Sequence, residues 1–511
     1  MTTEPQLSLY DRGPPPPCPE RFNLARHTLQ AAGAPPDKIA LEIIHDPAAP
    51  SDRFSYADLL GAVGGTMTGL RDQGMQPGDR VLLRLDHTLD FPLLFFAATG
   101  IGALPVPTSP QLTKGEISAI AAALSPRLTI ASPGIAVPED ATVIDADTAA
   151  AWRDLPGSDF ADTARDDPAY IIFTSGTGGR TKGVVHAHRA AWARRMMWDG
   201  WYGLGPADRL LHAGAFNWTY TLGTGLTDPW AAGATALIHA GPRDRGVWAS
   251  IAHRHSPTIF AAAPGVYRQL LSTGPARDAF ASLRHGLSAG EAMPDPLRRA
   301  WQQLTGTPIL EALGMSEVST YISQSPGNPV PLPQPGRRVA VLDPGGMPLP
   351  RGTDGELAVS DRDPGLMLGY WRADAPPDLP LSGEWFRTGD RARMAQDDAI
   401  THLGRLDDIL NAQGYRVSAR EIETVLQDHP AVAEAAATTR TVRQGVAVLA
   451  ALVVPHEDVS NTDLAAHCAR HLARYKVPRD IRIVDALPRT ATGKIARHRL
   501  ADWQPPHKDP Q

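Results

Sequence analysis

Short apolar runs alternate with longer amphipathic stretches over the first two thirds of the chain, and this alternation strongly limits how the chain can fold. Arg80–Leu85 (RVLLRL) and Leu104–Pro107 are predicted as buried strands, and Phe91–Gly100 between them is predicted as a helix. The same strand pattern recurs farther along the chain, at Tyr170–Phe173, Thr235–Ala240 and Thr258–Ala262. Strands that alternate with helices predict a large α/β domain with largely parallel sheets.

The sequence pattern changes after about residue 330. Turns rich in proline and glycine there separate short strands such as Val339–Leu342 and Glu356–Val359, which predicts a β-rich subdomain over about 330–404. The last hundred residues mix both element types, with helices expected at Ala419–Asp428 and Thr462–Arg474 and strands at Val446–Val454 and Asp480–Val484. We therefore expect an N-terminal domain over residues 1–404 and a small α+β C-terminal domain over 405–511.

Composition excludes several classes of protein. The 511 residues are 42% hydrophobic and 20% charged with a formal net charge of −6, which fits a soluble globular protein and gives no support to nucleic-acid binding. Cys18 and Cys468 are too few for a disulfide framework, which favours a reducing compartment. The N-terminus lacks the pattern of a signal peptide, and the apolar stretch Phe91–Val106 is too short for a membrane span. A cytoplasmic location is expected.

A loop rich in glycine and hydroxyl residues gives the strongest local signal, Thr174–Gly183 (TSGTGGRTKG). It follows an apolar strand (AYIIF) and precedes VVHAHRAAWARRMM, which is expected to be helical. Such a loop can offer backbone N–H groups and hydroxyls to a phosphate, and Lys182 adds a compact positive charge. It is not a Walker A loop, because Gly183 stands where Ser or Thr would hold magnesium. A flexible turn is the alternative interpretation.

Four further segments follow this loop in order along the chain: Leu313–Glu317 (LGMSE), Trp385–Asp390 (WFRTGD), Gly404–Arg416 (GRLDDILNAQGYR) and Arg489–Lys494 (RTATGK). Together the five motifs resemble those of the acyl-adenylate-forming superfamily, which includes acyl-CoA synthetases, peptide-synthetase adenylation domains and beetle luciferases. The resemblance covers roughly Phe22 to Leu500. The segments that begin at Asp79, Phe216 and Arg474 look most similar to benzoate-CoA ligases and medium-chain acyl-CoA synthetases.

The resemblance implies an ATP-dependent carboxylic acid:CoA ligase that uses Mg²⁺ and coenzyme A. A carboxylate oxygen would attack the α-phosphate of ATP, and pyrophosphate would leave. The thiol of coenzyme A would then displace AMP and form the thioester. Such phosphoryl transfer is catalysed mainly by positioning and electrostatics.

The resemblance also assigns roles to residues of this chain. The catalytic positions are Lys494 at the α-phosphate, Glu317 as the magnesium ligand, and Lys182. The nucleotide would further be held by the phosphate loop (Thr174, Ser175, Gly176, Thr177, Gly178 and Gly179), by Ser316, by Asp390 and Arg405 at the ribose, and at the adenine by Gly290, Glu291, Ala292, Glu311, Ala312 and Leu313. Gly178, Thr181, Leu313 and Ser316 depart from the residues usual in the family at those positions.

Domain movement is part of the same implied chemistry. Asp407 would be the hinge about which the C-terminal domain rotates between the two half-reactions, and Gly414, Tyr415 and Arg416 would contact coenzyme A. The expected acyl pocket comprises Phe216, Asn217, Trp218, Thr219, Ser288 and Gly314. No cationic partner for a second carboxylate is evident there, so an uncharged aromatic or short- to medium-chain acid is expected as the substrate.

Other functions stay open at this stage. The acyl acceptor could be the phosphopantetheine of a separate carrier protein, or the adenylate could serve a luciferase-type oxygenase. A degenerate scaffold is disfavoured because Lys182, Glu317, Asp390, Arg405 and Lys494 are all present. The histidine pairs His186/His188 and His253/His255 lack a third ligand at a sensible spacing, which disfavours a metal site. A homodimer is compatible with the sequence.

Lysine is scarce, with six lysines against 43 arginines. Two of the six, Lys182 and Lys494, fall in glycine-turn motifs where a compact ammonium group would contact phosphate. A planar guanidinium is a poor substitute at such a position. The scarcity therefore adds weight to both motifs.

Overall fold

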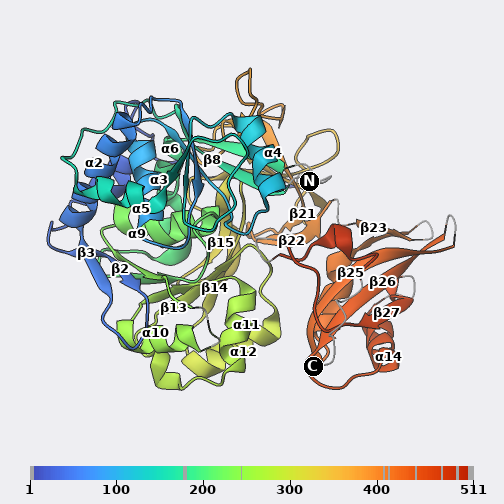
Figure 1. The fold of residues 1–511 in the computed structure, drawn as a ribbon. Helices are drawn as coiled ribbons and strands as arrows, with labels where there is room; N and C mark the ends of the chain where they lie inside the picture. Colours follow the sequence, from blue (N-terminus) through green and yellow to red (C-terminus); the bar gives the residue numbers. More distant parts are fainter. Residues whose placement is uncertain are drawn as a thin grey trace.

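The computed structural model describes residues 5–175, 181–242, 244, 246–406, 409–412, 415–443, 446–472, 476–490 and 494–503. Figure 1 shows a large domain, coloured blue to light orange, and a smaller dark-orange-to-red domain beside it. The predicted fold class, a large α/β domain with a β-rich part and a small α+β domain, is confirmed. None of the helices in the described part of the chain combines the length and apolar composition needed to cross a bilayer.

A nine-stranded sheet forms the centre of the large domain, with neighbours in the order β16-β15-β14-β13-β12-β10-β11-β2-β3. The strands from β14 to β2 in that order are parallel to their neighbours, and β15, β16 and β3 add antiparallel edges. Their bounds are β2 Ile39–Ile44, β3 Asp52–Ser55, β10 Arg209–His212, β11 Thr235–His239, β12 Ile259–Ala261, β13 His285–Ala289, β14 Ile309–Met315, β15 Ser319–Ser325 and β16 Asn328–Pro333.

Two smaller sheets complete the α/β part. Four parallel strands lie in the order β5-β4-β6-β7, with bounds β4 Arg80–Arg84, β5 Leu104–Pro107, β6 Leu128–Ala131 and β7 Val143–Asp145. Three antiparallel strands lie in the order β19-β9-β8, with bounds β8 Pro168–Ser175, β9 Thr181–Ala187 and β19 Gly369–Tyr370. The strands expected at Arg80, Leu104, Tyr170, Thr235 and Thr258 are therefore present, with ends that differ by a few residues at most.

Helices cover these sheets, and Figure 1 shows α2, α3, α5 and α6 around the blue and cyan strands and α10, α11 and α12 in the green lower part of the large domain. Ser55 with Asp58 and Thr113 with Glu116 form capping boxes that fix the starts of α2 and α4. The α-helices are α1 Leu24–Gln30, α2 Tyr56–Asp72, α3 Asp90–Gly100, α4 Lys114–Leu124, α5 Ala146–Ala150, α6 Arg189–Ala193, α7 Arg195–Met197, α8 Thr219–Leu222, α9 Asp228–Ala231, α10 Val247–His255, α11 Pro264–Ser272 and α12 Asp295–Thr305. Single-turn helices of other types span Ala151–Asp154, Trp198–Tyr202, Gly223–Thr227, Arg277–Phe280 and Arg497–Arg499.

The β-rich part is a six-stranded antiparallel sheet in the order β1-β17-β18-β21-β20, with β22 paired to β21. Its strands are β1 Leu9–Asp11, β17 Arg338–Leu342, β18 Asp354–Ser360, β20 Leu381–Ser382, β21 Trp385–Met394 and β22 Ile400–Arg405. The first strand comes from the N-terminal end of the chain, so this sheet joins segments more than 300 residues apart. Proximity in sequence alone did not indicate that pairing.

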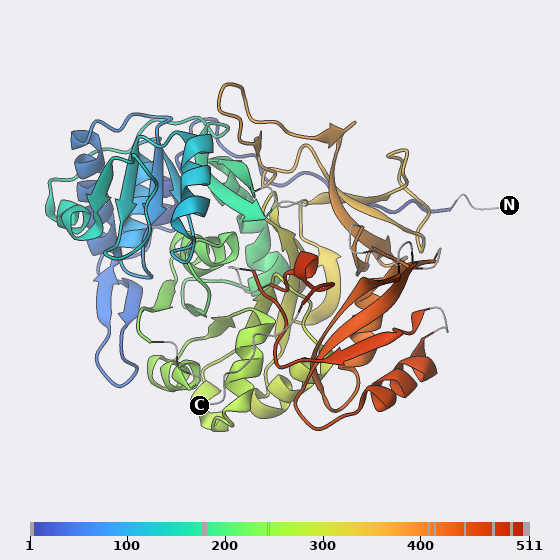
Figure 2. The same ribbon diagram turned by 45° about the vertical axis from the view of Figure 1, so that its right-hand side comes forward.

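The small domain contains a hairpin, β23 Ile409–Ala412 with β24 Tyr415–Ser418, and a three-stranded sheet in the order β25-β26-β27. The sheet strands are β25 Val432–Arg443, β26 Val446–Pro455 and β27 Asp480–Ile483, and the helices are α13 Ala419–Gln427 and α14 Asn461–His471. Ile422 and Leu426 on α13 pack with Leu464 and Cys468 on α14 in a separate apolar core. In Figure 2 the red final segment extends from this domain toward the large one.

One local expectation is wrong. The stretch after the phosphate loop, expected to be helical from Val184, begins as strand β9, and the helix α6 starts only at Arg189. Val184 and Val185 pair with Ile172 and Ile171 of β8, so the loop joins two antiparallel strands. β-Branched valines favour the strand, and burial of both side chains against neighbouring cores decides it.

Buried histidines predict acid sensitivity of the fold. Burial lowers the pKa of His27, His186, His188 and His285 to about 4, whereas an unfolded histidine titrates near 6.5. Between these values the unfolded chain binds protons that the folded chain does not, so stability present above pH 6.5 is lost as pH falls. We expect the melting temperature to decrease as the pH falls from 6.5 to 5.5. This pH range lies above the pKa values of ordinary carboxylates. Calorimetry across this range checks it, and unfolding without proton uptake would contradict it.

Candidate active site

A cavity of about 1000 Å³ lies at the carboxyl ends of strands from both parallel sheets. In α/β proteins this edge is where ligands bind, because successive loops converge there. Many of its lining residues come just after five strands: Leu85–His87 after β4, Thr108–Gln111 after β5, Ala213–Trp218 after β10, Ala263 after β12, and Gly290 with Glu291 after β13. The fold therefore brings Phe216, Asn217, Trp218, Gly290 and Glu291, all predicted from the sequence, to one cavity.

One part of the cavity has an aromatic wall. Phe216 is 2% exposed and stacks between the rings of His87, at a centroid distance of 3.8 Å, and Phe91, at 5.1 Å. Trp218 lies next to it, with its ring edge-on to Tyr220 at 5.1 Å. Walls of this kind suit a flat apolar group.

Gly290 is a position where the backbone approaches an aromatic ring. Its φ is +95°, and a Cβ placed there would lie 2.7 Å from the ring of Trp218 and 3.9 Å from Cε of Lys494. A side chain at this position would therefore be strained and would collide with Trp218. The contact places Trp218, the Gly290 backbone and Lys494 together.

Lys494 reaches the cavity from the small domain and keeps contact with solvent through it, although protein atoms surround the side chain. Burial lowers its pKa, while the carboxylates of Glu291, Asp390 and Glu317 act in the opposite direction. Burial likewise raises the pKa of Glu291, against the effect of Arg489 and Lys494. The ammonium group therefore lies within electrostatic range of the three carboxylates assigned to the nucleotide site.

An interdomain ion pair lies at the same side of the cavity. Arg268 on α11 contacts Oε1 of Glu434 on β25 at 2.5 Å, and Arg489 contacts both oxygens of Glu434 at 2.7–2.8 Å. All three residues line the cavity. Glu434 thus joins the small domain, which carries Lys494, to the large domain.

Lys182 and Glu317 meet at a tyrosine that sequence reasoning missed. Nζ of Lys182 on β9 lies 4.5 Å from the centre of the Tyr370 ring, and the Tyr370 hydroxyl donates a 2.9 Å hydrogen bond to Oε1 of Glu317. Tyr370 lies on β19, which pairs with β9, and the N–H of Met367 donates to the carbonyl of Glu317 at 2.8 Å. The phosphate loop and the turn after β14 are therefore tied together through this short strand.

Part of the predicted phosphate loop is outside the described residues, namely Gly176, Thr177, Gly178 and Gly179. Thr174 and Ser175 end β8, where they pair with Lys182 and Thr181 across the hairpin. The loop ends thus lie beside each other at the root of a hairpin, next to Lys182.

The surroundings of Glu317 fit a hard cation. The carboxylate is partly accessible, and carboxylate oxygens are the ligands that Mg²⁺ prefers. Within the described part of the chain, no group of three or more His, Cys, Asp or Glu side chains is arranged to hold a metal. Mg²⁺ at Glu317 would therefore take most of its ligands from phosphate and water, as is usual for this ion.

Asp390 and Arg405 face each other across strands β21 and β22. Oδ1 of Asp390 lies 3.1 Å from Nε2 of His402 and 3.6 Å from Nη1 of Arg405, which also donates to the carbonyl of Thr388 at 2.8 Å. Gly389 has φ +75°, and a Cβ there would meet the Arg405 guanidinium at 2.8 Å. The glycine lets the arginine pack against the strand beside the carboxylate.

Glu311, expected at the adenine, already has protein partners. Its Oε1 accepts a hydrogen bond from the backbone N–H of Met293 at 3.1 Å, and Oε2 accepts one from Arg298 at 2.8 Å. The segment with Gly290 and Ala292 is thereby fixed to β14. Ala312 is 5% exposed and pairs with Ala289, and Leu313 packs against the core of the β-rich part.

Three residues expected in the acyl pocket lie elsewhere. Thr219 lines a separate cavity of about 20 Å³, and Ser316 lines the same small cavity. Ser288 is fully buried within β13, and Gly314 lies against the backbone of Ser319 and Thr320. None of these three lines the large cavity. Thr219 and Ser288 each stand next to a lining residue in the sequence, whereas Gly314 does not, and all three were expected only from the family resemblance.

The predicted hinge and coenzyme A residues fall in the hairpin region of the small domain. Asp407 and Gly414 lie outside the described residues, while Tyr415 and Arg416 begin β24. The predicted boundary at 404/405 falls at the end of β22. These assignments stay predictions.

Several residues of the site were not assigned a role from the sequence. His87 lies in the segment from Asp79 that looked similar to benzoate-CoA ligases, and its place after a buried strand could have identified it. Arg268, Glu434 and Arg489 lie on separate elements in two domains, so sequence spacing does not connect them. Tyr370 stands in a turn-rich segment with no periodic pattern.

Comparisons with known proteins identify the family to which the chain belongs. The family model described as AMP-binding enzyme matches residues 28–371. A second model, described as AMP-binding enzyme C-terminal domain, matches residues 421–494. The benzoate–CoA ligase of Thauera aromatica is 31% identical, covering 97% of this chain and 99% of its own. The human acyl-coenzyme A synthetase ACSM3, a mitochondrial protein, is 27% identical, covering 95% and 90%.

Among solved structures, the anthranilate CoA ligase AuaEII in complex with anthranoyl-AMP superposes with a TM-score of 0.84. It is 27% identical, with 95% of this chain and 98% of that chain covered. The sequence matches extend over both domains, and the structural match covers 95% of the chain. The chain therefore belongs to the AMP-binding enzyme family, as its five ordered motifs indicated.

Proposed function

We propose that the protein is an ATP-dependent carboxylic acid:CoA ligase whose preferred substrate is an uncharged aromatic acid. The observation that carries this proposal is the position of Lys494 in a cavity with an aromatic wall, next to Trp218 and Gly290. One cavity thus contains a surface for a flat acyl group and a cation for its carboxylate.

The reaction has two steps. A carboxylate oxygen of the acid forms a bond to the α-phosphorus of ATP while the bond to the bridging oxygen breaks, which gives acyl-AMP and pyrophosphate. The deprotonated sulfur of coenzyme A then attacks the acyl carbon, and AMP leaves with the bonding electrons. ATP and coenzyme A are the co-substrates.

In the first step Lys494 neutralises charge on the attacking carboxylate and on the α-phosphate. A preorganised cation is effective there because its orientation costs nothing when the reaction occurs. Lys182 and the ends of the phosphate loop hold the β- and γ-phosphates, and Ser316 assists at the phosphate. Asp390 accepts hydrogen bonds from the ribose hydroxyls, and Arg405 keeps that carboxylate in place.

The adenine lies against the segments that follow β13 and β14, namely Gly290–Ala292 and Glu311–Leu313. Glu311 acts there by fixing the first segment to the second, since its oxygens already bind Met293 and Arg298. The substitution of an aromatic residue by Leu313 reduces ring stacking at this position.

Glu317 is the residue that would hold Mg²⁺. When bound, the cation neutralises phosphate charge and orients the leaving pyrophosphate. The Tyr370 hydroxyl orients the Glu317 carboxylate through its hydrogen bond to Oε1.

The second step requires the small domain to move. In the described arrangement Lys494 is in the cavity and Glu434 is bound to Arg268, which is the arrangement needed for adenylation. Rotation about Asp407 would withdraw Lys494 and bring the hairpin with Gly414, Tyr415 and Arg416 to the cavity, where it meets the pantetheine arm.

The aromatic preference is supported by the Phe216, His87 and Trp218 wall. It is also supported by two relatives whose names specify benzoate and anthranilate. The two cavity arginines, Arg268 and Arg489, are both engaged by Glu434. A second carboxylate on the substrate would therefore have to compete with Glu434 for either arginine of the described cavity lining.

A panel of acids tests the proposed function. With MgATP, we expect benzoate and its neutral derivatives to give acyl-CoA and AMP when coenzyme A is present, octanoate to react less efficiently, and malonate to fail. Product formation is followed by liquid chromatography and mass spectrometry. Release of AMP without acyl-CoA formation would contradict the CoA ligase assignment and favour a carrier-protein acceptor or an oxygenase.

Removing the ammonium group tests the role of Lys494. We expect Lys494→Ala to slow acyl-adenylate formation by about 10²–10³-fold, the loss typical of one preorganised electrostatic contact. Thioester formation from supplied acyl-AMP should be largely retained, because the lysine is needed only at the α-phosphate.

The matched control is Lys114→Ala. Lys114 is an exposed lysine at the start of the surface helix α4, where it pairs with Glu139. This variant should leave both half-reactions unchanged. Equal loss of both half-reactions in Lys494→Ala would refute the assigned role.

A further inference from the structure

An ion pair lies buried behind the turn that carries Ser316 and Glu317. Arg194 is 8% exposed and Asp228 is 1% exposed, and two parallel contacts join them: Nε to Oδ1 at 2.8 Å and Nη2 to Oδ2 at 2.5 Å. Burial opposes the charge on Arg194, but the Asp228 carboxylate outweighs it and the pKa of the arginine is raised. The guanidinium is therefore permanently charged in a nearly dry site.

The remaining donors of Arg194 reach three hydroxyl groups. Nη1 donates to Oγ of Ser319 at 2.7 Å, and Nη2 donates to the Tyr202 hydroxyl at 3.1 Å and to Oγ1 of Thr224 at 3.2 Å. The Tyr202 hydroxyl in turn donates to Asp228 at 2.7 Å. Among these described partners of Arg194, only Ser319 adjoins the turn between β14 and β15, because it is the first residue of β15.

Unusual backbone conformations surround this cluster. Tyr202 and Thr224 lie in two separate π-helical segments, Trp198–Tyr202 and Gly223–Thr227, and π-helical turns are rare and frequent at functional sites. A Cβ on Gly223 would overlap the Arg194 guanidinium. Ser319 has φ +74°, in the left-handed region that a residue with a side chain seldom adopts.

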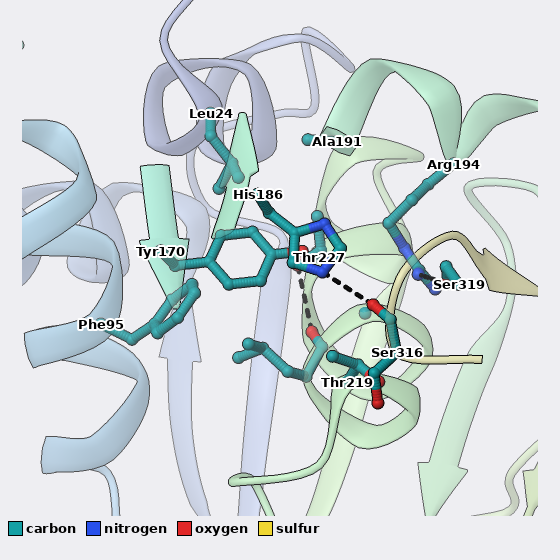
Figure 3. Close-up of a pocket in the computed structure, with 12 residues that line it drawn as sticks. Leu24, Phe95, Tyr170, His186, Ala191, Arg194, Thr219, Thr227, Ser316 and Ser319 are labelled. Carbon is teal, nitrogen blue, oxygen red and sulfur yellow. Dashed lines mark hydrogen bonds between the residues drawn. The ribbon is translucent and has the colours of Figure 1, made fainter. Parts of the chain in front are cut away.

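The other end of the turn is held by a histidine. Nε2 of His186 lies 2.8 Å from the carbonyl oxygen of Ser316, and the ring stacks on Tyr170 at 4.7 Å. Burial lowers the pKa of His186 to about 4, so the neutral ring donates its Nε2–H to the carbonyl. Figure 3 shows His186 directed at Ser316 and Arg194 directed at Ser319, around a cavity of about 20 Å³ that both contacts line.

We propose that Arg194 is a positioning residue for adenylation. Anchored by Asp228, it holds the Ser319 hydroxyl at the start of β15, fixes the preceding turn and so sets the place of Ser316 and Glu317. The inference rests on the proposed function, because it assigns the purpose of the turn to MgATP binding. Glu317 is then constrained on both sides, by Tyr370 at its carboxylate and by Arg194 two residues farther along the chain.

Stability alone gives a poor account of this cluster. The desolvation of a buried ion pair offsets much of its Coulomb energy, so apolar side chains of similar volume often stabilise a core as well. A guanidinium differs from them in its fixed directions, because it binds a carboxylate and separate hydroxyls at the same time. Hydrogen bonds of fixed direction can hold a turn that is followed by a residue in a strained backbone conformation.

Two substitutions separate positioning from folding. Ser319→Ala removes only the hydroxyl that Arg194 binds, and Arg194→Lys keeps the charge beside Asp228 but lacks the planar fork. We expect each to raise the Kd of MgATP, measured by calorimetry without acid, and to lower kcat/KM for adenylation by about tenfold or more, as for other groups that orient a metal ligand. Turnover of supplied acyl-AMP with coenzyme A should be retained.

The double variant tests the connection between the two residues. Because the Arg194–Ser319 bond is already lost in either single variant, the double variant should be little worse than the more impaired single one. Multiplied losses would contradict the proposed connection.

The control is Glu42→Gln, which disturbs another buried acid, 1% exposed and bound to Arg209 and His255 away from the turn. It should lower the melting temperature without a selective effect on MgATP. The inference is overturned if the Arg194 and Ser319 variants lose both half-reactions equally, or lose only stability as Glu42→Gln does. Failure of the proposed function would look different, since the unmodified enzyme would then form no acyl-CoA.

Discussion

The whole site depends on one topological constraint, the meeting of the carboxyl ends of two parallel sheets at one cavity. In a parallel sheet every strand delivers its following loop to the same edge, so residues far apart in sequence converge without any local signal. His87 after β4, Trp218 after β10 and Gly290 after β13 reach one space for this reason. The aromatic wall, the close approach at Gly290 and the position of the nucleotide segments all follow from that shared edge.

The second domain completes what the sheets cannot supply. The edge provides apolar walls and the carboxylates Glu291 and Glu317, but the ammonium group that faces them, Lys494, comes from the opposite end of the chain. Its position depends on contacts between domains, of which Arg268 with Glu434 is the clearest. An ion pair that joins two domains can break when the domains separate. Such a contact suits a reaction in which each of the two steps needs a different part of the small domain at the cavity.

The sequence predicted elements and motifs well where local chemistry decides them. The ends of β4, α3 and β5 were predicted to within a residue or so, because apolar periodicity and flanking turns set them. The helix expected from Val184 was wrong because pairing with β8, a long-range contact, decided that segment. Phe216, Asn217 and Trp218 line the cavity as their motif suggested, whereas Thr219 and Ser288 do not. A single residue step along a strand or helix turns a side chain away, and sequence spacing cannot resolve that step.

The sequence by itself determined the chemistry that is available. It identified five ordered motifs, a charge balance that argues against nucleic acid, and two of six lysines placed where an ammonium group would meet phosphate. Only the tertiary structure decided which groups act together: Tyr370 between Lys182 and Glu317, Glu434 between two arginines, and Arg194 behind the Ser316–Glu317 turn. The reason is physical, since these contacts join segments tens to hundreds of residues apart, and their geometry is fixed by strand order and packing rather than by neighbours in the chain.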